Sequence, residues 1–321
     1  MTMKTGVSPA PQREDILTLL KNRRKSLAIR SLKWGRLRSR MMAFVAMTRG
    51  EFNFGEWLAF LLPGSMWPHE LAVKYALWHD MQYEYLIKDI LTDSDTVRLY
   101  GVDFRFASAY EMVWLVYSVI NRDQYCAKRF LKEDSIVIDA GANIGAFSIL
   151  GTRLVPRGHI YAFEPAPKTF AMLRANTESY KQIVCVPSGL GDVTGYKNIL
   201  IKDEKENGGS VFEDSPFFER FKNDPGALIA ASVTTIDSFV AARGLPQVDF
   251  IKIDTEGYEA KIMEGARETI KKWKPIVAMS AYHNPNDKED LPRLLKEICP
   301  DYTCELQKDC EEDLICFVKI R

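Results

Sequence analysis

The stretch with the clearest capacity for chemistry joins an aspartate to two glycines, in the pattern D-x-G-x-x-x-G. Apolar residues precede Asp139, and apolar residues at helical spacing follow Gly145, so the pattern predicts a buried strand, a tight turn and the start of a helix. Such a turn presents free backbone N–H groups and the positive end of the helix dipole to a ligand, and its glycines put no Cβ in the way. The candidate ligand-binding residues of this turn are Asp139, Gly141, Asn143 and Gly145.

The acid at the end of this strand favours a cationic amino-acid ligand over a phosphate. The spacing differs from the dinucleotide pattern G-x-G-x-x-G and from the P-loop, which places a lysine after its last glycine. The next strand-like segment ends in Glu164, which is placed to hold the two hydroxyls of a ribose. Together the two acids predict S-adenosylmethionine bound across a doubly wound sheet. Taken singly, Asp139 is more typical of a helix-capping turn residue, and Glu164 of a solvated acid.

A second set of candidate residues follows two later strand-like segments. Asp254 and Glu256 come directly after one of them, and His283 follows the next. Because substrates of open α/β sheets bind outside the carboxyl ends of the strands, these three residues are predicted to face the substrate and to catalyse. The alternatives are that Asp254 braces a turn, that Glu256 caps a helix and that His283 is a structural residue. Lys252 is assigned to the strand itself.

Strand-like and helical segments alternate from residue 134 onward, which predicts an α/β fold with a doubly wound, mostly parallel sheet. The last two strands, separated by acidic residues, predict an antiparallel C-terminal hairpin. Asp192, just past the third strand, is placed to accept the adenine amino group or to serve as a turn residue. The seven expected strands are Ile136–Ile138, His159–Phe163, Ile183–Val186, Val248–Ile253, Ile276–Met279, Tyr302–Leu306 and Leu314–Ile320.

The alternation breaks between Tyr196 and Asp237, where a long polar stretch contains glycine, charge and phenylalanine. Such an insertion on the ligand side of a sheet is a candidate lid or, equally, a disordered loop. Beyond the strand-four acids, apolar residues at helical spacing predict one helix from Tyr258 to Trp273.

The N-terminal region differs in composition from the rest. Residues 1–91 are predicted to form a helical appendage with a basic tail, and residues 92–321 the main domain, which opens with a hairpin over Thr96–Phe106. Residues 1–50 hold twelve basic and two acidic residues. A solvated basic helix is the favoured interpretation, and a grip on anionic substrate, membrane surface or nucleic acid is the alternative.

The whole chain has 321 residues, 46% of them hydrophobic, so it can bury a full core. Its formal net charge is zero, so the chain as a whole does not attract a polyanionic partner. Its six cysteines form no C-x-x-C pair, which favours a reduced compartment with cysteines as buried hydrophobes. No apolar run is long enough to span a bilayer, and no signal peptide is visible, so we expect no transmembrane segment and a cytoplasmic location.

Three motifs carry a family resemblance. Val137–Gly145 (VIDAGANIG), Phe163–Pro165 (FEP) and above all Asp249–Glu259 (DFIKIDTEGYE) resemble the FkbM family of S-adenosylmethionine-dependent methyltransferases. The resemblance begins near residue 96 and runs to the C-terminus. It implies a seven-stranded methyltransferase fold and O-methylation of a hydroxyl on a sugar or another small molecule.

Alternatives to this function stay open. Asp254 also resembles the magnesium ligand of catechol-type O-methyltransferases, which makes Mg²⁺ an option, although the rest of that constellation is not evident and no metal ligand is assigned. An RNA or protein methyltransferase would use the basic N-terminal region, but no RNA-binding signature accompanies it, so nucleic acid is not the expected partner. A third alternative is a scaffold that binds S-adenosylmethionine without catalysis. The sequence names neither the acceptor nor the oligomeric state.

Overall fold

The structure is a computed structural model that describes residues 96–99, 102–106, 115–121, 123–202, 210–220, 222–223, 226–307 and 313–318. The predicted helical appendage, residues 1–91, lies outside the described residues, and the domain boundary stays a prediction. The predicted hairpin near residue 100 is present, because β1 (Thr96–Leu99) pairs antiparallel with β2 (Val102–Arg105). A π-helical turn, η3 (Val116–Asn121), comes after the hairpin in the chain.

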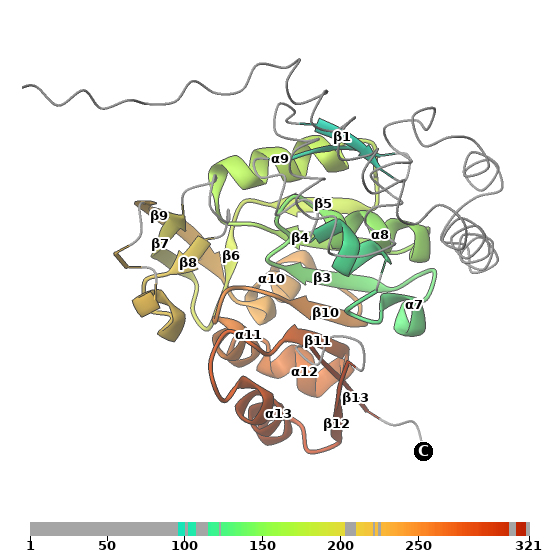
Figure 1. The fold of residues 1–321 in the computed structure, drawn as a ribbon. Helices are drawn as coiled ribbons and strands as arrows, with labels where there is room; N and C mark the ends of the chain where they lie inside the picture. Colours follow the sequence, from blue (N-terminus) through green and yellow to red (C-terminus); the bar gives the residue numbers. More distant parts are fainter. Residues whose placement is uncertain are drawn as a thin grey trace, which may run out of the picture. The chain divides into compact units, whose positions relative to one another are not determined.

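A seven-stranded sheet forms the centre of the fold (Figure 1), with the strand order β12-β13-β11-β10-β3-β4-β5. The five strands from β11 to β5 in this order pair in parallel, and β13 pairs antiparallel with both β11 and β12. The predicted α/β class and seven-stranded sheet are confirmed. The strands are β3 (Ile136–Ala140), β4 (His159–Phe163), β5 (Ile183–Val186), β10 (Phe250–Ile253), β11 (Ile276–Ser280), β12 (Tyr302–Leu306) and β13 (Asp313–Val318).

Both faces of the sheet are buried. Successive side chains of a strand point to opposite sides, and each side packs into a hydrophobic cluster. In β3, Ile136 and Ile138 pack into one hydrophobic cluster with α10 to α13, while Val137 packs into a second cluster with η3, α7 and α8. Apolar residues on consecutive positions of the strand are the sequence signal for this double burial. The helices are α7 (Ala127–Phe130), α8 (Ala146–Leu154), α9 (Pro167–Thr177), α10 (Ile236–Arg243), α11 (Glu259–Glu264), α12 (Arg267–Trp273) and α13 (Asp287–Ile298).

The segment predicted to be a lid or a disordered loop folds, in its described parts, into a second sheet of the order β6-β9-β7-β8. β9 pairs antiparallel with β7 over eight residue pairs from Gly195 to Lys202, and β8 adds to the other edge of β7. Residues 203–209 lie outside the described residues. The strands are β6 (Gly189–Leu190), β7 (Gly195–Lys202), β8 (Ser210–Phe212) and β9 (Gly226–Thr234), and a 3₁₀ turn, η4 (Pro216–Arg220), follows β8.

The single helix predicted from Tyr258 to Trp273 is wrong, because the structure has two helices, α11 and α12, separated at Gly265. A Cβ on Gly265 would lie 1.9 Å from the carbonyl oxygen of Gly191, so a neighbouring loop occupies the place of a side chain. The side chain of Asp237 then accepts hydrogen bonds from two backbone N–H groups in the first turn of α12. Contacts with distant parts of the chain therefore break the helix where local spacing favoured continuity.

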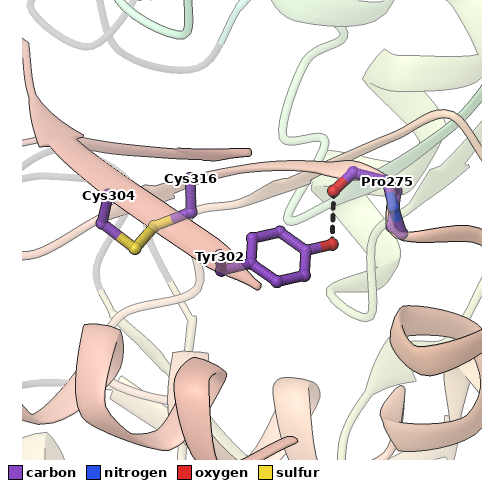
Figure 2. The surroundings of a disulfide bond; sticks show 4 residues. All are labelled: Pro275, Tyr302, Cys304 and Cys316. Atoms are coloured by element: carbon purple, nitrogen blue, oxygen red, sulfur yellow. Dashed lines mark hydrogen bonds between the residues drawn. A yellow bond between two sulfur atoms is a disulfide. The ribbon is translucent and has the colours of Figure 1, made fainter. Parts of the chain in front are cut away.

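Two cysteines of the C-terminal hairpin form a disulfide, Cys304–Cys316, between β12 and β13 (Figure 2). The expectation of reduced cysteines is therefore wrong for this pair, whose residues lie directly opposite each other in the strand register. Sequence spacing does not reveal such a cross-strand contact. In the same hairpin the Tyr302 hydroxyl donates a hydrogen bond to the carbonyl oxygen of Pro275.

No helix among the described residues is long and apolar enough to cross a membrane. The cytoplasmic location stays a prediction.

Candidate active site

An open cavity lies at the carboxyl ends of β3, β4 and β10, with an empty space of about 830 Å³ including its mouth. The wall contains five residues that the sequence predicted to be functional: Gly141, Asn143, Glu164, Asp254 and Glu256. The other four predicted residues are not part of the wall: Asp139, Gly145, Asp192 and His283.

The turn after β3 owes its glycines to the protein rather than to a ligand. Gly141 has a φ of 74°, and a Cβ there would lie 2.0 Å from the carbonyl oxygen of Asp254. Gly145 has a φ of 94°, and a Cβ there would meet the side chain of Leu173 at 2.9 Å. The sequence analysis explained the glycines of this turn by the space that a ligand needs, and that explanation is incomplete. Gly141 also lets the turn after β3 pack directly on the end of β10.

Glu164 fixes this turn from the end of β4. Its carboxylate accepts hydrogen bonds from the backbone N–H of Asn143 at 3.1 Å and of Ala166 at 2.9 Å. The side chain is 5% exposed yet lines the cavity. Since each carboxylate oxygen accepts more than one hydrogen bond, these contacts orient Glu164 and leave it able to bind hydroxyls. Its contact with ribose stays a prediction.

Asp139 is completely buried in β3. It accepts a hydrogen bond from the Ser148 hydroxyl at 2.7 Å and forms an ion pair with Lys252, whose Nζ lies 3.2 Å away. The carboxylate is therefore neutralised within the protein and does not line the cavity. Its predicted contact with a cationic ligand stays untested, and its observed role is to hold the lysine.

Lys252 is a site residue that the sequence reasoning missed. Its side chain is 5% exposed, and its Nζ donates hydrogen bonds to the carbonyl oxygens of Gly141 at 2.7 Å and Ala140 at 3.3 Å. It lines the cavity and thus joins the end of β10 to the turn after β3. The signal was a charged residue inside the apolar strand FIKI, because a lysine is almost never fully buried without a partner.

Asp254 is the central acid of the cavity wall. Its Oδ2 accepts a hydrogen bond from the Tyr125 hydroxyl at 2.9 Å, and its Oδ1 lies 3.8 Å from Nε2 of His283. Burial alone would raise the pKa of Asp254, but the positive charges of Lys252 and His283 and the hydrogen bond from Tyr125 hold it below its usual value. Asp254 is therefore an ionised carboxylate facing the cavity.

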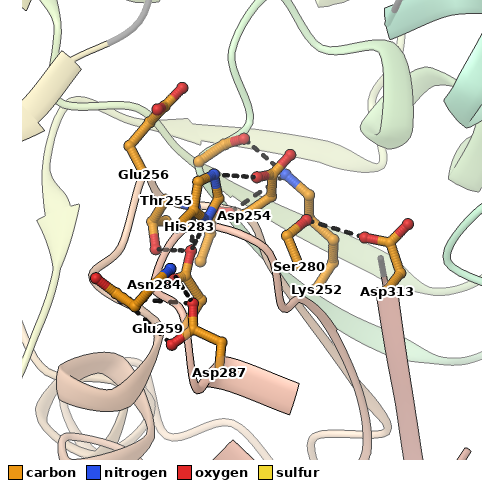
Figure 3. Close-up of polar contacts among 12 residues, drawn as sticks. Lys252, Asp254, Thr255, Glu256, Glu259, Ser280, His283, Asn284, Asp287 and Asp313 are labelled. Carbon is orange, nitrogen blue, oxygen red and sulfur yellow. Dashed lines mark hydrogen bonds and ion pairs between the residues drawn. The ribbon is translucent and has the colours of Figure 1, made fainter. Parts of the chain in front are cut away.

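His283 lies between Asp254 and Glu259, as Figure 3 shows, and is 2% exposed. Its Nδ1 is 3.0 Å from Oε1 of Glu259, a residue of α11 that is 1% exposed. Burial would lower the pKa of His283, but the hydrogen bond to Glu259 and the charges of Glu259, Asp254 and Glu256 raise it to about 9. Glu259 also accepts a hydrogen bond from the backbone N–H of Thr255. The sequence reasoning found His283 but missed Glu259.

Glu256 lines the cavity with a backbone in the left-handed region, at a φ of 55°, directly before Gly257 at 85°. Such a conformation costs a non-glycine residue free energy and clusters at functional sites. The alternative role as a cap of a helix beginning at Gly257 is wrong, because α11 begins at Glu259 and Tyr258 occupies its N-cap position.

Asp192 lies in an ion-pair network with Lys197 at 3.7 Å and Lys261 at 3.5 Å. Both lysines also pair with Asp214, which follows β8. The predicted contact of Asp192 with adenine stays untested, because its carboxylate is outside the cavity wall. In the structure Asp192 belongs to the contacts between the second sheet and α11.

The surroundings of Asp254 do not fit the Mg²⁺ site that the sequence left as an option. Its charged neighbours include the ammonium group of Lys252 and the imidazole of His283, and the group of donor atoms that it forms with His283 and Glu259 contains a nitrogen. Mg²⁺ prefers an octahedral set of oxygen ligands. Mg²⁺ is therefore assigned no role in the reaction.

Comparison with known proteins places this geometry in a family. Residues 139–306 match the model of the methyltransferase FkbM domain. The 31-O-demethyl-FK506 methyltransferase FkbM of Streptomyces tacrolimicus is 29% identical over 160 residues, covering 43% of this chain and 62% of that protein. The hexuronic acid methyltransferase AglP of Haloferax volcanii is 24% identical over 168 residues, covering 52% of this chain and 63% of that protein.

The chain thus spans about three fifths of the length of these curated relatives. A solved structure, the methyltransferase FkbM of Methylobacillus flagellatus KT, is 19% identical, with a TM-score of 0.43 over 87% of this chain and 70% of that chain. The family model includes the turn after β3, the acids after β10 and the segment after β11. On the strength of that match over more than half of its length, the chain belongs to the FkbM methyltransferase family.

Proposed function

We propose that the protein is an S-adenosylmethionine-dependent O-methyltransferase that acts on a hydroxyl group of a sugar or another small molecule. The observation that carries the proposal is that one cavity joins Glu164 and the turn after β3 to the acids Asp254 and Glu256. The first pair suits a nucleoside with an amino-acid tail, and the second suits an acceptor hydroxyl. A transfer between two small molecules requires both to lie in one cavity, with the reacting atoms in contact.

The residues on one side of the cavity fit S-adenosylmethionine. Gly141 and Asn143 form part of the cavity wall, so a ligand in the cavity would lie against the turn after β3. Glu164 would hold the ribose hydroxyls, since a buried carboxylate beside a turn is the usual partner of this group. When bound, this cofactor supplies an electrophilic methyl group on a sulfonium.

The residues on the other side suit an alcohol. Asp254, ionised and braced by Tyr125, would accept a hydrogen bond from the acceptor hydroxyl and take its proton as the oxygen loses it. Glu256 would orient the same or a neighbouring hydroxyl. Methyl transfer demands little beyond alignment of the oxygen and exclusion of water, so a carboxylate of low pKa is sufficient.

The acceptor class rests on the relatives. One is named a 31-O-demethyl-FK506 methyltransferase and another a hexuronic acid methyltransferase. A hydroxyl-rich small molecule is accordingly the proposed acceptor. No observation on the described residues favours an RNA or protein methyltransferase or a non-catalytic scaffold, and both stay alternatives for the experiment below.

Calorimetry and mass spectrometry test the proposal together. We expect the full chain to bind S-adenosylmethionine and S-adenosylhomocysteine but not nicotinamide dinucleotides. With S-adenosylmethionine and a metabolite extract, small molecules that gain one methyl group should appear. Binding of a nicotinamide dinucleotide with none of either sulfur ligand would refute the cofactor. Binding without turnover on any acceptor would support the scaffold, and methylated RNA or protein would support the macromolecular alternative.

A variant ties the binding to the site. Glu164→Ala should weaken S-adenosylmethionine binding by roughly 2–3 kcal/mol, the range for losing a charged hydrogen-bond partner. Glu178→Ala, on the exposed end of α9, is the matched control and should leave affinity unchanged. Equal affinities in the two variants would remove Glu164 from the cofactor site.

A further inference from the structure

A row of three ionisable groups runs from the cavity wall into the protein. Asp254 is at the wall, His283 follows at 3.8 Å, and Glu259 contacts the far side of the imidazole at 3.0 Å. One donor atom from each lies within 4.8 Å of the others. The three come from different parts of the fold, because Asp254 follows β10, Glu259 belongs to α11 and His283 follows β11.

The environment of His283 is strongly acidic. The groups that face it are four carboxylates and the ring of Tyr282, whose centroid lies 4.3 Å from that of the imidazole. His283 is 2% exposed, so water does not stabilise the charge of its protonated imidazole. The groups that face it are Glu259 from α11, Asp254 and Glu256 from the segment after β10, Tyr282 beside it and Asp287 from α13.

We propose that Glu259 is a positioning residue: it fixes His283 as a buried imidazolium directed at Asp254, so that Asp254 alone receives the proton of the acceptor hydroxyl. This inference rests on the proposed function. An imidazolium carries a proton on both nitrogens and has no lone pair to offer, so it is a cation and not a base. Its charge keeps Asp254 ionised and oriented toward the cavity.

The step that follows is balanced. A lone pair of the acceptor oxygen forms the new oxygen–methyl bond while the sulfur–methyl bond breaks and its electron pair returns to sulfur. The oxygen–hydrogen bond then breaks, and its proton passes to the carboxylate of Asp254. The oxygen is strongly acidic once methylated, so a carboxylate of low basicity is an adequate acceptor. Asp254 returns the proton to water through the mouth of the cavity.

Nuclear magnetic resonance of labelled histidine tests the inference without cofactor or acceptor. The His283 signal, assigned by its loss in His283→Gln, should titrate near pH 9 in the native protein. In Glu259→Gln the midpoint should fall by about one pH unit or more, as expected when an opposite charge in contact is removed. Glu264→Gln on the same helix, whose carboxylate pairs with Arg267, is the matched control and should leave the midpoint unchanged.

Two results would overturn the inference at this stage. One is a native midpoint near or below pH 7, which would make His283 a neutral imidazole. The other is the same midpoint in Glu259→Gln as in the native protein. Because neither measurement involves S-adenosylmethionine, a failure here is distinct from a failure of the proposed function.

Rates of single-turnover methyl transfer then separate positioning from catalysis. In the native enzyme we expect no rise in rate as His283 deprotonates. In His283→Gln, which removes the positive charge beside Asp254, we expect the acidic limb of the pH–rate profile, set by Asp254, to move to higher pH. Glu259→Gln should not move the limb to higher pH, because His283 stays protonated across the acidic range in that variant. A tenfold rise per pH unit between pH 7 and 9 that vanishes in His283→Gln would show instead that His283 is the base.

Discussion

Lysines pair with aspartates in two regions of this protein, and the surroundings of the two are opposite. In the seven-stranded sheet, Lys252 contacts Asp139 with side-chain exposures of 5% and 0%. At the second sheet, Asp214 pairs with Lys197 and Lys261, with exposures from 19% to 42%. Water compensates each charge of the second group, whereas each charge of the first depends on its partner. The same residue types therefore serve different purposes: the buried pair defines the site, and the exposed network attaches the second sheet to α11.

The strongest test of this comparison removes one buried charge. Lys252→Met should lower the free energy of unfolding by about 3–5 kcal/mol, because Asp139 would be left buried and uncompensated. Urea denaturation followed by circular dichroism measures the loss. The double variant Lys252→Met with Asp139→Asn removes both charges and should recover a large part of it. A double variant no more stable than the single one would show that Lys252 contributes through its backbone contacts instead.

The next largest effect is expected on catalysis. Asp254→Asn should lower the rate of methyl transfer roughly a hundredfold, because the carboxamide cannot take the proton of the acceptor. Affinity for S-adenosylmethionine should stay within twofold. Single-turnover kinetics and calorimetry measure the two quantities. Asp214→Asn, the same change in the exposed network, should leave both unaffected, and a native rate in Asp254→Asn would confine this acid to a structural role.

A pH-dependent contribution to stability should follow from His283. Its pKa is raised in the folded state from an ordinary value of 6.5 to about 9. The stabilisation is therefore fully present below about pH 6.5 and is lost as the pH rises through 9. The difference in unfolding free energy between the native protein and His283→Gln, measured at both pH values, isolates this group from others that titrate. A difference that does not shrink at the higher pH would contradict the buried imidazolium.

The smallest effect is expected in the exposed network. The hydrogen bonds of Asp214 with Lys197, Lys261 and Tyr258 outweigh burial and lower its pKa to about 2, so its contribution is present above about pH 3.8 and is lost as the pH falls toward 2. Even so, Asp214→Asn should change the free energy of unfolding by less than about 1 kcal/mol near neutral pH, because water and salt screen the pairs. Thermal denaturation at low and high ionic strength measures this. A loss as large as that of Lys252→Met would erase the distinction between the two regions.

The strand positions were predictable because buried parallel strands leave a strong local signal. His159–Phe163 and Ile183–Val186 agree with β4 and β5 residue for residue. The acids Asp254 and Glu256 were found for the same reason, since each stands directly after a strand whose end had been located. Local patterns also placed Glu164 at the cavity wall.

The residues that sequence reasoning missed act through contacts that local patterns do not record. Tyr125 reaches Asp254 across 129 positions of the chain, and Lys252 reaches Gly141 across 111. Glu259 appeared to be one more polar residue at the start of a helix. Asp139 was assigned to a ligand because an acid at the end of a strand favours a cationic ligand, and the ion pair with Lys252 was not foreseen. A local pattern such as FIKI reveals a buried charge but not the partner that neutralises it.

The packing of Gly141 against the carbonyl oxygen of Asp254 bears on the order and synergy of binding. The turn that would hold the cofactor and the strand end that would hold the acceptor touch through backbone atoms and through Lys252. A displacement of either one on binding would change the free energy of occupying the other half of the cavity. Such a coupling is reciprocal by thermodynamic necessity. The affinity for each of the two substrates of the proposed reaction should therefore depend on whether the other is already bound.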